Sequence, residues 1–250
     1  MLIHETIEKL KRLRLPGFVE ALEEQQQISS YQELSFEERL GLLVDRELDK
    51  RKSNRIKRLI RQAKFQNSEA CIENIDYKPE RHLRKQQILE LASCQFIDHA
   101  KNINILGATG AGKSYLAQAL GQAACRLGYS TRYVQLPDML DELTIAKERG
   151  MESFTKLKQY YTKVRLLIID EWLLFKISEE DCQTLLQIID RRSSKNSTIV
   201  ISQFSPDEWI SQIPIQVAAE AITDRLTAQA YEIIIHSRES MRKQEQKEEI

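Results

Sequence analysis

Gly107-Ala108-Thr109-Gly110-Ala111-Gly112-Lys113-Ser114 is the stretch that decides the fold. A mostly apolar run, Ile103–Leu106, precedes it, and a helical pattern begins at Tyr115. The spacing is that of a phosphate-binding loop, G-x-x-x-x-G-K-[ST], in its strand–loop–helix context. Glycines let successive backbone N–H groups turn inward around phosphate oxygens, and the helix that follows adds the positive end of its dipole. These flanks argue against a chance glycine-rich turn.

The loop predicts a nucleotide site that extends from Gly107 to Tyr115. In such loops the lysine reaches the β- and γ-phosphates and the hydroxyl residue binds Mg²⁺. We therefore expect ATP and Mg²⁺ as cofactors, with Lys113 at the phosphates and Ser114 at the metal.

A second motif, Asp170-Glu171, follows the continuous apolar run Leu166–Ile169. Such a run is typical of a strand buried on both faces of a parallel sheet. Ligands of open α/β sheets bind at the carboxyl ends of the strands. We expect Asp170 to hold Mg²⁺ or one of its waters, and Glu171 to polarise a water against the γ-phosphate. This arrangement favours hydrolysis over transfer to an acceptor hydroxyl, although a strand that simply returns to solvent is the alternative.

The second half of the chain alternates strands and helices, which predicts an α/β fold with a parallel five-stranded sheet and flanking helices. An all-helical region precedes it, because Ser35–Glu38 forms a capping box and apolar residues recur at helical spacing. The predicted domains are a helical DNA-binding and assembly domain (1–66), a linker (67–98), the nucleotide-binding domain (99–240) and a charged tail (241–250). The predicted strands are 102–106, 131–136, 165–170, 198–202 and 231–236.

Composition narrows the function classes only slightly. The 250 residues carry 37 basic and 37 acidic side chains, so overall charge does not indicate a partner. Four dispersed cysteines form no C-x-x-C pair, which argues against a zinc ribbon or a disulfide framework. We see no secretory signal and no apolar run that could span a membrane, so we expect a cytoplasmic protein with no membrane partner.

The segment from Lys50 to Lys64 is strongly basic and holds no acidic residue. Interleaved apolar residues predict a basic amphipathic helix, which suits the phosphate backbone of double-stranded DNA without reading its bases. A solvated helix face and an anionic membrane surface are the alternatives. The candidate DNA contacts are Lys50, Arg51, Lys52, Arg55, Lys57, Arg58, Arg61 and Lys64.

Two further side chains are candidates for the reaction itself. Gln203 ends the strand that follows Asp170-Glu171, where an amide could hold the attacking water; an ordinary strand-end amide is the alternative. Arg225 lies in a helical segment, where most arginines are solvated. Its residue type also suits an arginine that stabilises phosphoryl-transfer charge in a neighbouring subunit, and the residues alone leave both interpretations open.

With these motifs in hand, the chain resembles the IstB-like AAA+ ATPases, transposition helper proteins of insertion sequences that are related to the DnaC helicase loader. The resemblance covers most of the chain. The strings that carry it are Leu15-Pro16-Gly17, Leu34–Leu40, Ile75-Asp76-Tyr77, Gly107–Ser114, Ile169–Trp172, Ser202-Gln203, Trp209, Asp224-Arg225-Leu226 and Glu239–Lys243.

The resemblance implies an AAA+ ATPase that assembles on DNA as a ring or helical filament bridged by ATP, deforms the DNA and delivers it to a partner transposase. It implies that Arg225 is the arginine finger. The chain departs from many relatives at Leu173-Leu174-Phe175 and at Ser237-Arg238, and the second departure leaves a sensor role for Arg242 open. The alternatives are a helicase loader, whose zinc-binding version the cysteine spacing disfavours, and a metabolic kinase, which Glu171 disfavours.

Overall fold

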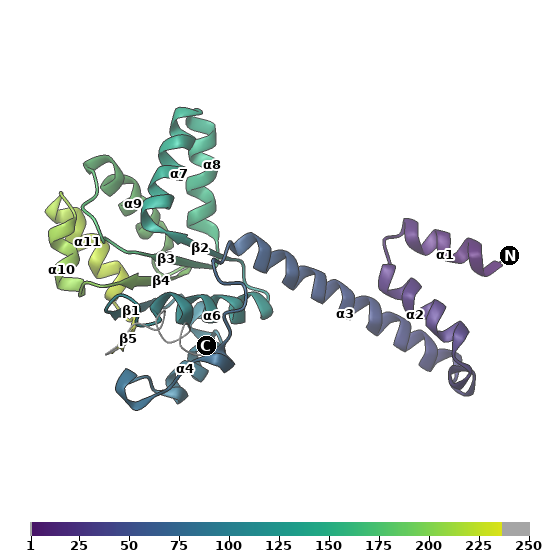
Figure 1. The fold of residues 1–250 in the computed structure, drawn as a ribbon. Helices are drawn as coiled ribbons and strands as arrows, with labels where there is room; N and C mark the ends of the chain where they lie inside the picture. Colours follow the sequence, from purple (N-terminus) through teal and green to yellow (C-terminus); the bar gives the residue numbers. More distant parts are fainter. Residues whose placement is uncertain (1, 237–250) are drawn as a thin grey trace, which may run out of the picture. The chain divides into compact units, whose positions relative to one another are not determined.

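The structure is a computed structural model that describes residues 2–236. The chain divides into two compact units, Met1–Arg58 and Leu59–Ile250, and helix α3 (Phe36–Ala63) contributes to both. The predicted charged tail (241–250) and Arg242 lie outside the described residues. We describe each unit by itself (Figure 1).

The smaller unit is entirely helical. Helices α1 (Leu2–Arg12) and α2 (Pro16–Gln27) and a 3₁₀ turn (Ser29–Glu33) precede α3. The predicted capping box at the start of α3 is confirmed: the Glu38 N–H donates to Ser35 Oγ at 3.2 Å, and the Ser35 N–H donates to Glu38 Oε2 at 2.8 Å. This reciprocal pair satisfies two N–H groups that the first turn of a helix leaves without an intrahelical acceptor.

A buried carboxylate, Glu47 of α3, joins α2 to α3. Its Oε2 accepts the N–H groups of Gly17 at 2.7 Å and Phe18 at 3.1 Å, at the positive end of α2. A Cβ at Gly17 would lie 2.8 Å from the Arg46 carbonyl oxygen, so only glycine allows this close approach. Burial alone would raise the pKa of Glu47, but the hydrogen bonds from Arg51, Phe18 and Gly17 outweigh it and lower that pKa.

The larger unit contains the predicted parallel sheet. Its strands are β1 (Ile103–Gly107), β2 (Thr131–Gln135), β3 (Leu166–Asp170), β4 (Ser197–Ser202) and β5 (Tyr231–Ile235). They pair in the order β2-β3-β4-β1-β5, and every pairing is parallel. The fold class expected from the sequence is therefore confirmed, and the carboxyl ends of β1, β3 and β4 lie next to one another.

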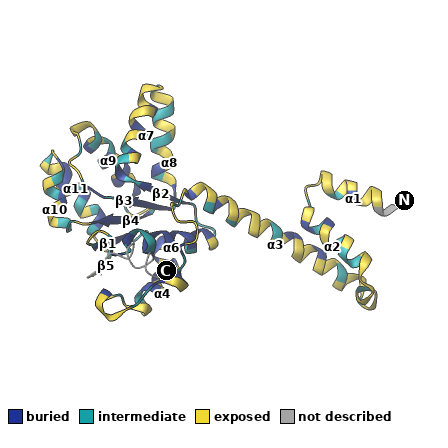
Figure 2. Ribbon diagram, viewed as in Figure 1, coloured by how far each residue is buried: buried dark blue, intermediate teal, exposed yellow. Residues whose placement is uncertain are grey.

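Helices cover both faces of the sheet, and successive strand residues alternate between the two cores. Ile168 and Ile105 pack on the side of α4 (Lys85–Ala92), α5 (Gln95–Asp98) and α6 (Lys113–Arg126). Leu167 and Leu106 pack on the other side, and Figure 2 shows the resulting buried centre. The helices of that side are α7 (Leu136–Glu148), α8 (Met151–Lys163), α9 (Glu179–Arg192), α10 (Pro206–Gln212) and α11 (Gln216–Thr227).

Residues 67–98, for which the sequence predicts a linker, contribute to the first core. Ala70, Ile72, Ile75, Ile88 and Leu91 are all buried there. Two 3₁₀ turns, Ile72–Asn74 and Pro79–Arg81, lead to α4. Polar turns and Lys78-Pro79 make this segment read as a linker, although its apolar residues pack against α6 and the sheet.

A buried arginine joins the end of α8 and the residue that follows it to the start of β4. Arg192 is 1% exposed. Its guanidinium donates to the backbone carbonyls of Tyr161, Thr162, Val164 and Ser197 and to Thr198 Oγ1. Burial lowers the pKa of Arg192 to about 9.

None of the helices within residues 2–236 combines the length and the apolar composition that a membrane span requires.

Candidate functional site

The predicted nucleotide residues meet in one cavity at the carboxyl end of the sheet. Its volume is about 140 Å³. It lies where β1, β3 and β4 end and α6 begins. The structure thus brings together side chains that the sequence places in three separate motifs: Thr109, Gly110, Lys113, Ser114, Asp170, Glu171 and Gln203.

The backbone of the loop has the conformation that its glycines predict. Gly110 and Gly112 have φ of 77° and 86°, a region that side chains rarely adopt. Gly107, with φ of 147°, lies so close to β5 that a Cβ would be 2.3 Å from the Ile235 carbonyl oxygen. Lys113 is buried, and its Nζ donates to the Ala108 carbonyl oxygen at 2.8 Å. Burial lowers the pKa of Lys113, and the nearby Asp170 carboxylate opposes that shift.

Asp170 is a buried carboxylate that is held at both oxygens. The Glu171 N–H donates to its Oδ1 at 2.8 Å, and the Tyr133 hydroxyl donates to its Oδ2 at 2.6 Å. Because Mg²⁺ prefers hard oxygen ligands and keeps several of its waters, Asp170 and Ser114 form a donor set that fits this metal. Each Asp170 oxygen keeps a lone pair for the metal or for a metal-bound water.

Glu171 has a left-handed backbone conformation, with φ of 52°. A non-glycine residue there costs about 1–2 kcal/mol. The next residue, Trp172, anchors the turn: its N–H donates to the Ile201 carbonyl oxygen at 2.9 Å, and its ring packs edge-on against Trp209. The Glu171 carboxylate accepts a hydrogen bond from Gln135 Nε2 at 3.0 Å. The strained turn therefore directs this carboxylate into the cavity, beside the end of β2.

Gln203 connects β4 to the phosphate loop. The Thr109 hydroxyl donates to Gln203 Oε1 at 2.8 Å. The backbone leading to Gln203 is fixed by Ser202, whose hydroxyl donates to the Trp172 carbonyl oxygen and accepts from Trp209 Nε1. The amide thus lies beside the loop and the two acidic residues, as a sensor role requires.

A second cavity, of about 270 Å³, lies beside the same loop and is bordered by Gly112, Tyr115, Leu116 and Ile75. Arg81 also borders it and is buried; it donates to the Asp76 carbonyl oxygen at 2.6 Å and to the Ala111 carbonyl oxygen at 2.8 Å. Of these residues the sequence predicted Gly112 and Tyr115. The sequence gives no signal for Arg81, because an isolated arginine in an irregular segment resembles a solvated one.

Arg225 does not border either of these cavities. It lies on α11, where its Nε and Nη2 contact Asp190 Oδ1 of α9 at 2.9 and 2.8 Å, and its Nη1 donates to the Ala221 carbonyl oxygen. A role for Arg225 in catalysis would therefore be exerted on another copy of the chain, and it would require release from Asp190.

The predicted basic segment is helical up to Ala63, and its charged side chains are mostly exposed. In the smaller unit, Lys50 pairs with Glu20, and Arg51 pairs with Glu47 at 2.6 Å. In the larger unit, Lys64 lies 3.6 Å from Glu142, and Arg61 is exposed. Exposed cations that no acid neutralises in residues 2–236 remain in both units: Lys52, Lys57, Arg58 and Arg61.

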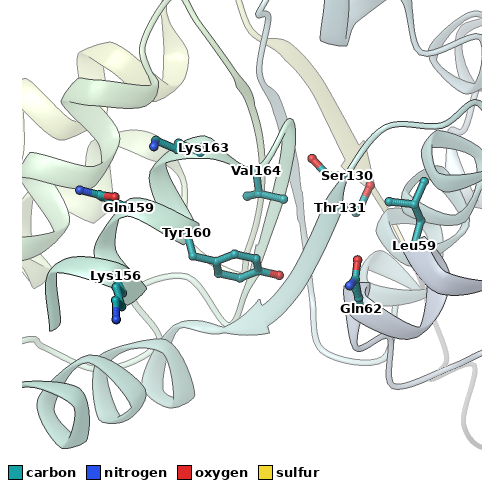
Figure 3. Close-up of a pocket in the computed structure, with 9 residues that line it drawn as sticks. All are labelled: Leu59, Gln62, Ser130, Thr131, Lys156, Gln159, Tyr160, Lys163 and Val164. Atoms are coloured by element: carbon teal, nitrogen blue, oxygen red, sulfur yellow. The ribbon is translucent and has the colours of Figure 1, made fainter. Parts of the chain in front are cut away.

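A larger cavity, of about 370 Å³, lies elsewhere in the larger unit and is not part of this site. Ser130 and Thr131 border it at the amino end of β2 (Figure 3). Tyr160 of α8 faces Gln62 of α3 across it.

The phosphate loop, the paired acids and the five-stranded parallel sheet define a P-loop protein of the AAA+ class. Comparison with solved structures agrees: the fold is similar to the crystal structure of the DnaC helicase loader, with a TM-score of 0.57 and 17% identity, over 66% of this chain and 96% of that one. At this identity the likeness concerns the fold alone.

The family follows from the sequence comparisons. The model of the IstB-like ATP binding proteins matches residues 8–249, so the chain belongs to this family. The chain is 43% identical to an ATP-binding protein of insertion sequence IS1162 from Pseudomonas fluorescens, over 81% of this chain and 87% of that protein. It is 35% identical to an insertion-sequence ATP-binding protein of Sinorhizobium fredii, over 99% of both chains. It is thus an AAA+ ATP-binding protein of the insertion-sequence type.

Proposed function

We propose that this protein is a DNA-dependent ATPase that helps an insertion sequence to transpose. The observation that carries the proposal is that Lys113, Ser114, Asp170 and Glu171 line one and the same cavity. A protein that only bound nucleotide would need the loop but not a second, strained carboxylate beside the magnesium ligand. Glu171 in a left-handed turn is such a carboxylate, and strain of this kind tends to be kept at functional sites.

Each residue of the cavity has a separate role in the proposed hydrolysis of ATP. Backbone N–H groups of residues 107–114 and the Lys113 ammonium bind the phosphates of ATP, and the neighbouring cavity at Gly112 and Tyr115 takes the base. Asp170 and Ser114 hold Mg²⁺, which neutralises charge on the phosphates when bound. Glu171 accepts the proton of the attacking water, and Gln203 orients that water. A general base of this kind contributes a factor of roughly 10²–10⁴ to the rate.

DNA is the proposed partner of the basic segment. The exposed cationic side chains of α3 are interleaved with apolar residues, and the segment contains no motif that reads DNA bases. DNA binding is therefore electrostatic and largely independent of the DNA sequence. The relatives are named for insertion sequences, which favours delivery of target DNA to a partner transposase over the loading of a helicase. The likeness to the DnaC helicase loader is one of fold and carries no preference for loading.

Assembly completes the proposed active site. The side chains around the cavity include one buried cation, Lys113, and the structure pairs Arg225 with Asp190 on another surface. A copy of the chain that offers Arg225 to its neighbour would supply a second cation, which in other phosphoryl-transfer enzymes is worth about 10³–10⁵ in rate. ATP would then bridge subunits, in a ring or a helical filament on DNA.

Mixing two inactive variants tests this arrangement. Arg225→Ala keeps an intact nucleotide site, and Lys113→Ala keeps an intact finger, so a mixed interface contains one complete site. We expect DNA-stimulated ATP hydrolysis to recover on mixing. Absence of recovery in particles shown to contain both variants, or full activity of Arg225→Ala alone, would contradict the role. Electron microscopy of the protein with double-stranded DNA and a non-hydrolysable ATP analogue should show the assembly on DNA, and isolated monomers would contradict it.

A further inference from the structure

Tyr133 is a buried residue whose hydroxyl faces the proposed metal site. It lies on β2, two residues before Gln135, so both side chains emerge from the same face of the strand. Its side chain is packed in the core beneath α6, with 3% exposure. The hydroxyl donates to Asp170 Oδ2 at 2.6 Å. Hydrogen bonds from a hydroxyl to a carboxylate are short and stronger than neutral ones, so this contact restricts the orientation of Asp170.

The same hydroxyl has a second neighbour, Gln66, whose Oε1 lies 3.3 Å away. A tyrosine hydroxyl has one hydrogen, and the shorter, charge-assisted contact to Asp170 takes it. With its amide rotated, Gln66 donates from Nε2 to the tyrosine oxygen instead; the two amide orientations occupy the same space. The result is a chain of donors from Gln66 through Tyr133 to Asp170, in which each hydrogen bond polarises the next.

Gln66 is exposed and borders the nucleotide cavity, and the segment around it is fixed on α6. Phe65 lies against Gly121, where an added Cβ would be 2.7 Å from the ring. On the other side, the Asn67 N–H donates to Gln118 Oε1 at 2.7 Å. Gln122 Nε2 donates to the Ser68 carbonyl oxygen at 2.8 Å. The hydrogen-bond chain therefore begins in a segment that α6, the helix of the phosphate loop, holds in place.

The segment also continues directly from the last turns of α3. Leu59 and Ala63 of α3 are buried in one cluster with Cys125 of α6. On this same stretch, Arg61 is an exposed cation, and Lys64 is exposed with its Nζ 3.6 Å from Glu142 Oε1. A phosphate backbone bound to these side chains would act on the stretch of chain that carries Gln66.

From this geometry we infer that Gln66 and Tyr133 form a positioning pair for Asp170, through which nucleic acid at the end of α3 regulates Mg²⁺-dependent nucleotide binding. The inference rests on the proposed function, because it takes Asp170 as the magnesium ligand. Tyr133 does not touch the nucleotide in this account. It holds the carboxylate in the orientation that binds the metal, and Gln66 makes that orientation depend on the position of the segment. The coupling is reciprocal, since bound Mg²⁺–nucleotide then strengthens DNA binding by the same factor.

The first experiment removes only the tyrosine hydroxyl. Tyr133→Phe keeps the ring in the core, and the readout is the binding of a fluorescent, non-hydrolysable ATP analogue at increasing Mg²⁺. We expect the Mg²⁺ concentration for half-maximal binding to rise roughly tenfold or more, the usual effect of losing a hydrogen bond to a charged group. Binding without Mg²⁺ should be unchanged. The matched control is Tyr129→Phe, which removes another tyrosine–aspartate contact, to Asp98 at 2.8 Å, away from the site.

The second experiment adds double-stranded DNA to the same titration. In the wild-type chain, DNA should lower the Mg²⁺ concentration needed for half-maximal binding, and Gln66→Ala should abolish that change. The control is Gln62→Ala, one turn earlier at the end of α3. An unchanged Mg²⁺ requirement in Tyr133→Phe overturns the positioning role, and a DNA effect that persists in Gln66→Ala overturns the regulation. If the wild-type chain binds no nucleotide at all, the proposed function fails instead, so the two failures are distinguishable.

Discussion

Replacing Glu171 by glutamine should separate ATP binding from ATP hydrolysis. Glutamine has nearly the same size, can adopt the same left-handed conformation at similar cost, and can still accept the hydrogen bond from Gln135 Nε2. The turn remains anchored by the Trp172 N–H, so we expect a folded protein with nearly unchanged ATP affinity. What is lost is the charged group that takes the proton of water.

The size of the effect follows from that loss. A general base contributes roughly 10²–10⁴ in rate, or about 3–5 kcal/mol of activation free energy. We therefore expect the DNA-stimulated kcat to fall at least a hundredfold, measured by phosphate release with ATP in excess. The control is Glu148→Gln, an exposed glutamate at the end of α7, which should retain wild-type turnover. Turnover within threefold of wild type in Glu171→Gln would refute the reasoning and transfer the role to Gln203.

Three more outcomes are expected. Lys113→Ala should abolish detectable ATP binding in isothermal titration calorimetry, because Lys113 is the buried cation among the described residues that line the cavity; near-normal affinity in a folded variant would contradict the site. Replacing Arg58 and Arg61 by alanine should weaken binding to all DNA sequences alike and reduce the slope of log affinity against log salt by about 2, since each phosphate contact contributes about 0.9; an unchanged slope would exclude these contacts. The pKa of Glu47 is lower in the folded chain than its ordinary value of 4.5. The Glu47 carboxylate therefore stabilises the helical unit at pH values above 4.5, and this stabilisation is lost as the pH falls through the lowered pKa. Glu47→Gln should therefore lower the unfolding temperature at pH 7 and reduce its dependence on pH below about 4.5; equal losses at both pH values would contradict the charge argument.

Much of the larger unit could be predicted because parallel strands buried on both faces appear as apolar runs. The runs before Gly107 and Asp170 mark β1 and β3 to within one or two residues, and the phosphate loop and the paired acids lie where those two strands end. The helix cap at Ser35 could be predicted equally well, since it depends on residues only three positions apart.

The residues that sequence reasoning missed act through contacts between distant positions. Tyr133 and Asp170 are 37 residues apart, and Tyr133 and Gln66 are 67 apart. A tyrosine and a glutamine two residues apart at the end of a buried strand were the available signal, because a buried polar group needs a partner. Nothing local distinguishes Gln66 from a solvated amide.

The pairing of Arg225 with Asp190 could not be predicted from the sequence either, because it depends on how α9 packs against α11. The pair is partly exposed, and such ion pairs are worth at most about 1 kcal/mol. Releasing Arg225 to a neighbouring subunit therefore costs little, so the observed contact is compatible with the proposed role in trans.

The most direct test of the central claim is the ATP turnover of the 250-residue chain, measured with and without double-stranded DNA at low and high salt. We expect slow turnover alone, faster turnover with DNA of unrelated sequences, and loss of that stimulation as salt releases the DNA. ATP binding without any effect of DNA on turnover, at salt concentrations where DNA is shown to be bound, would contradict the account.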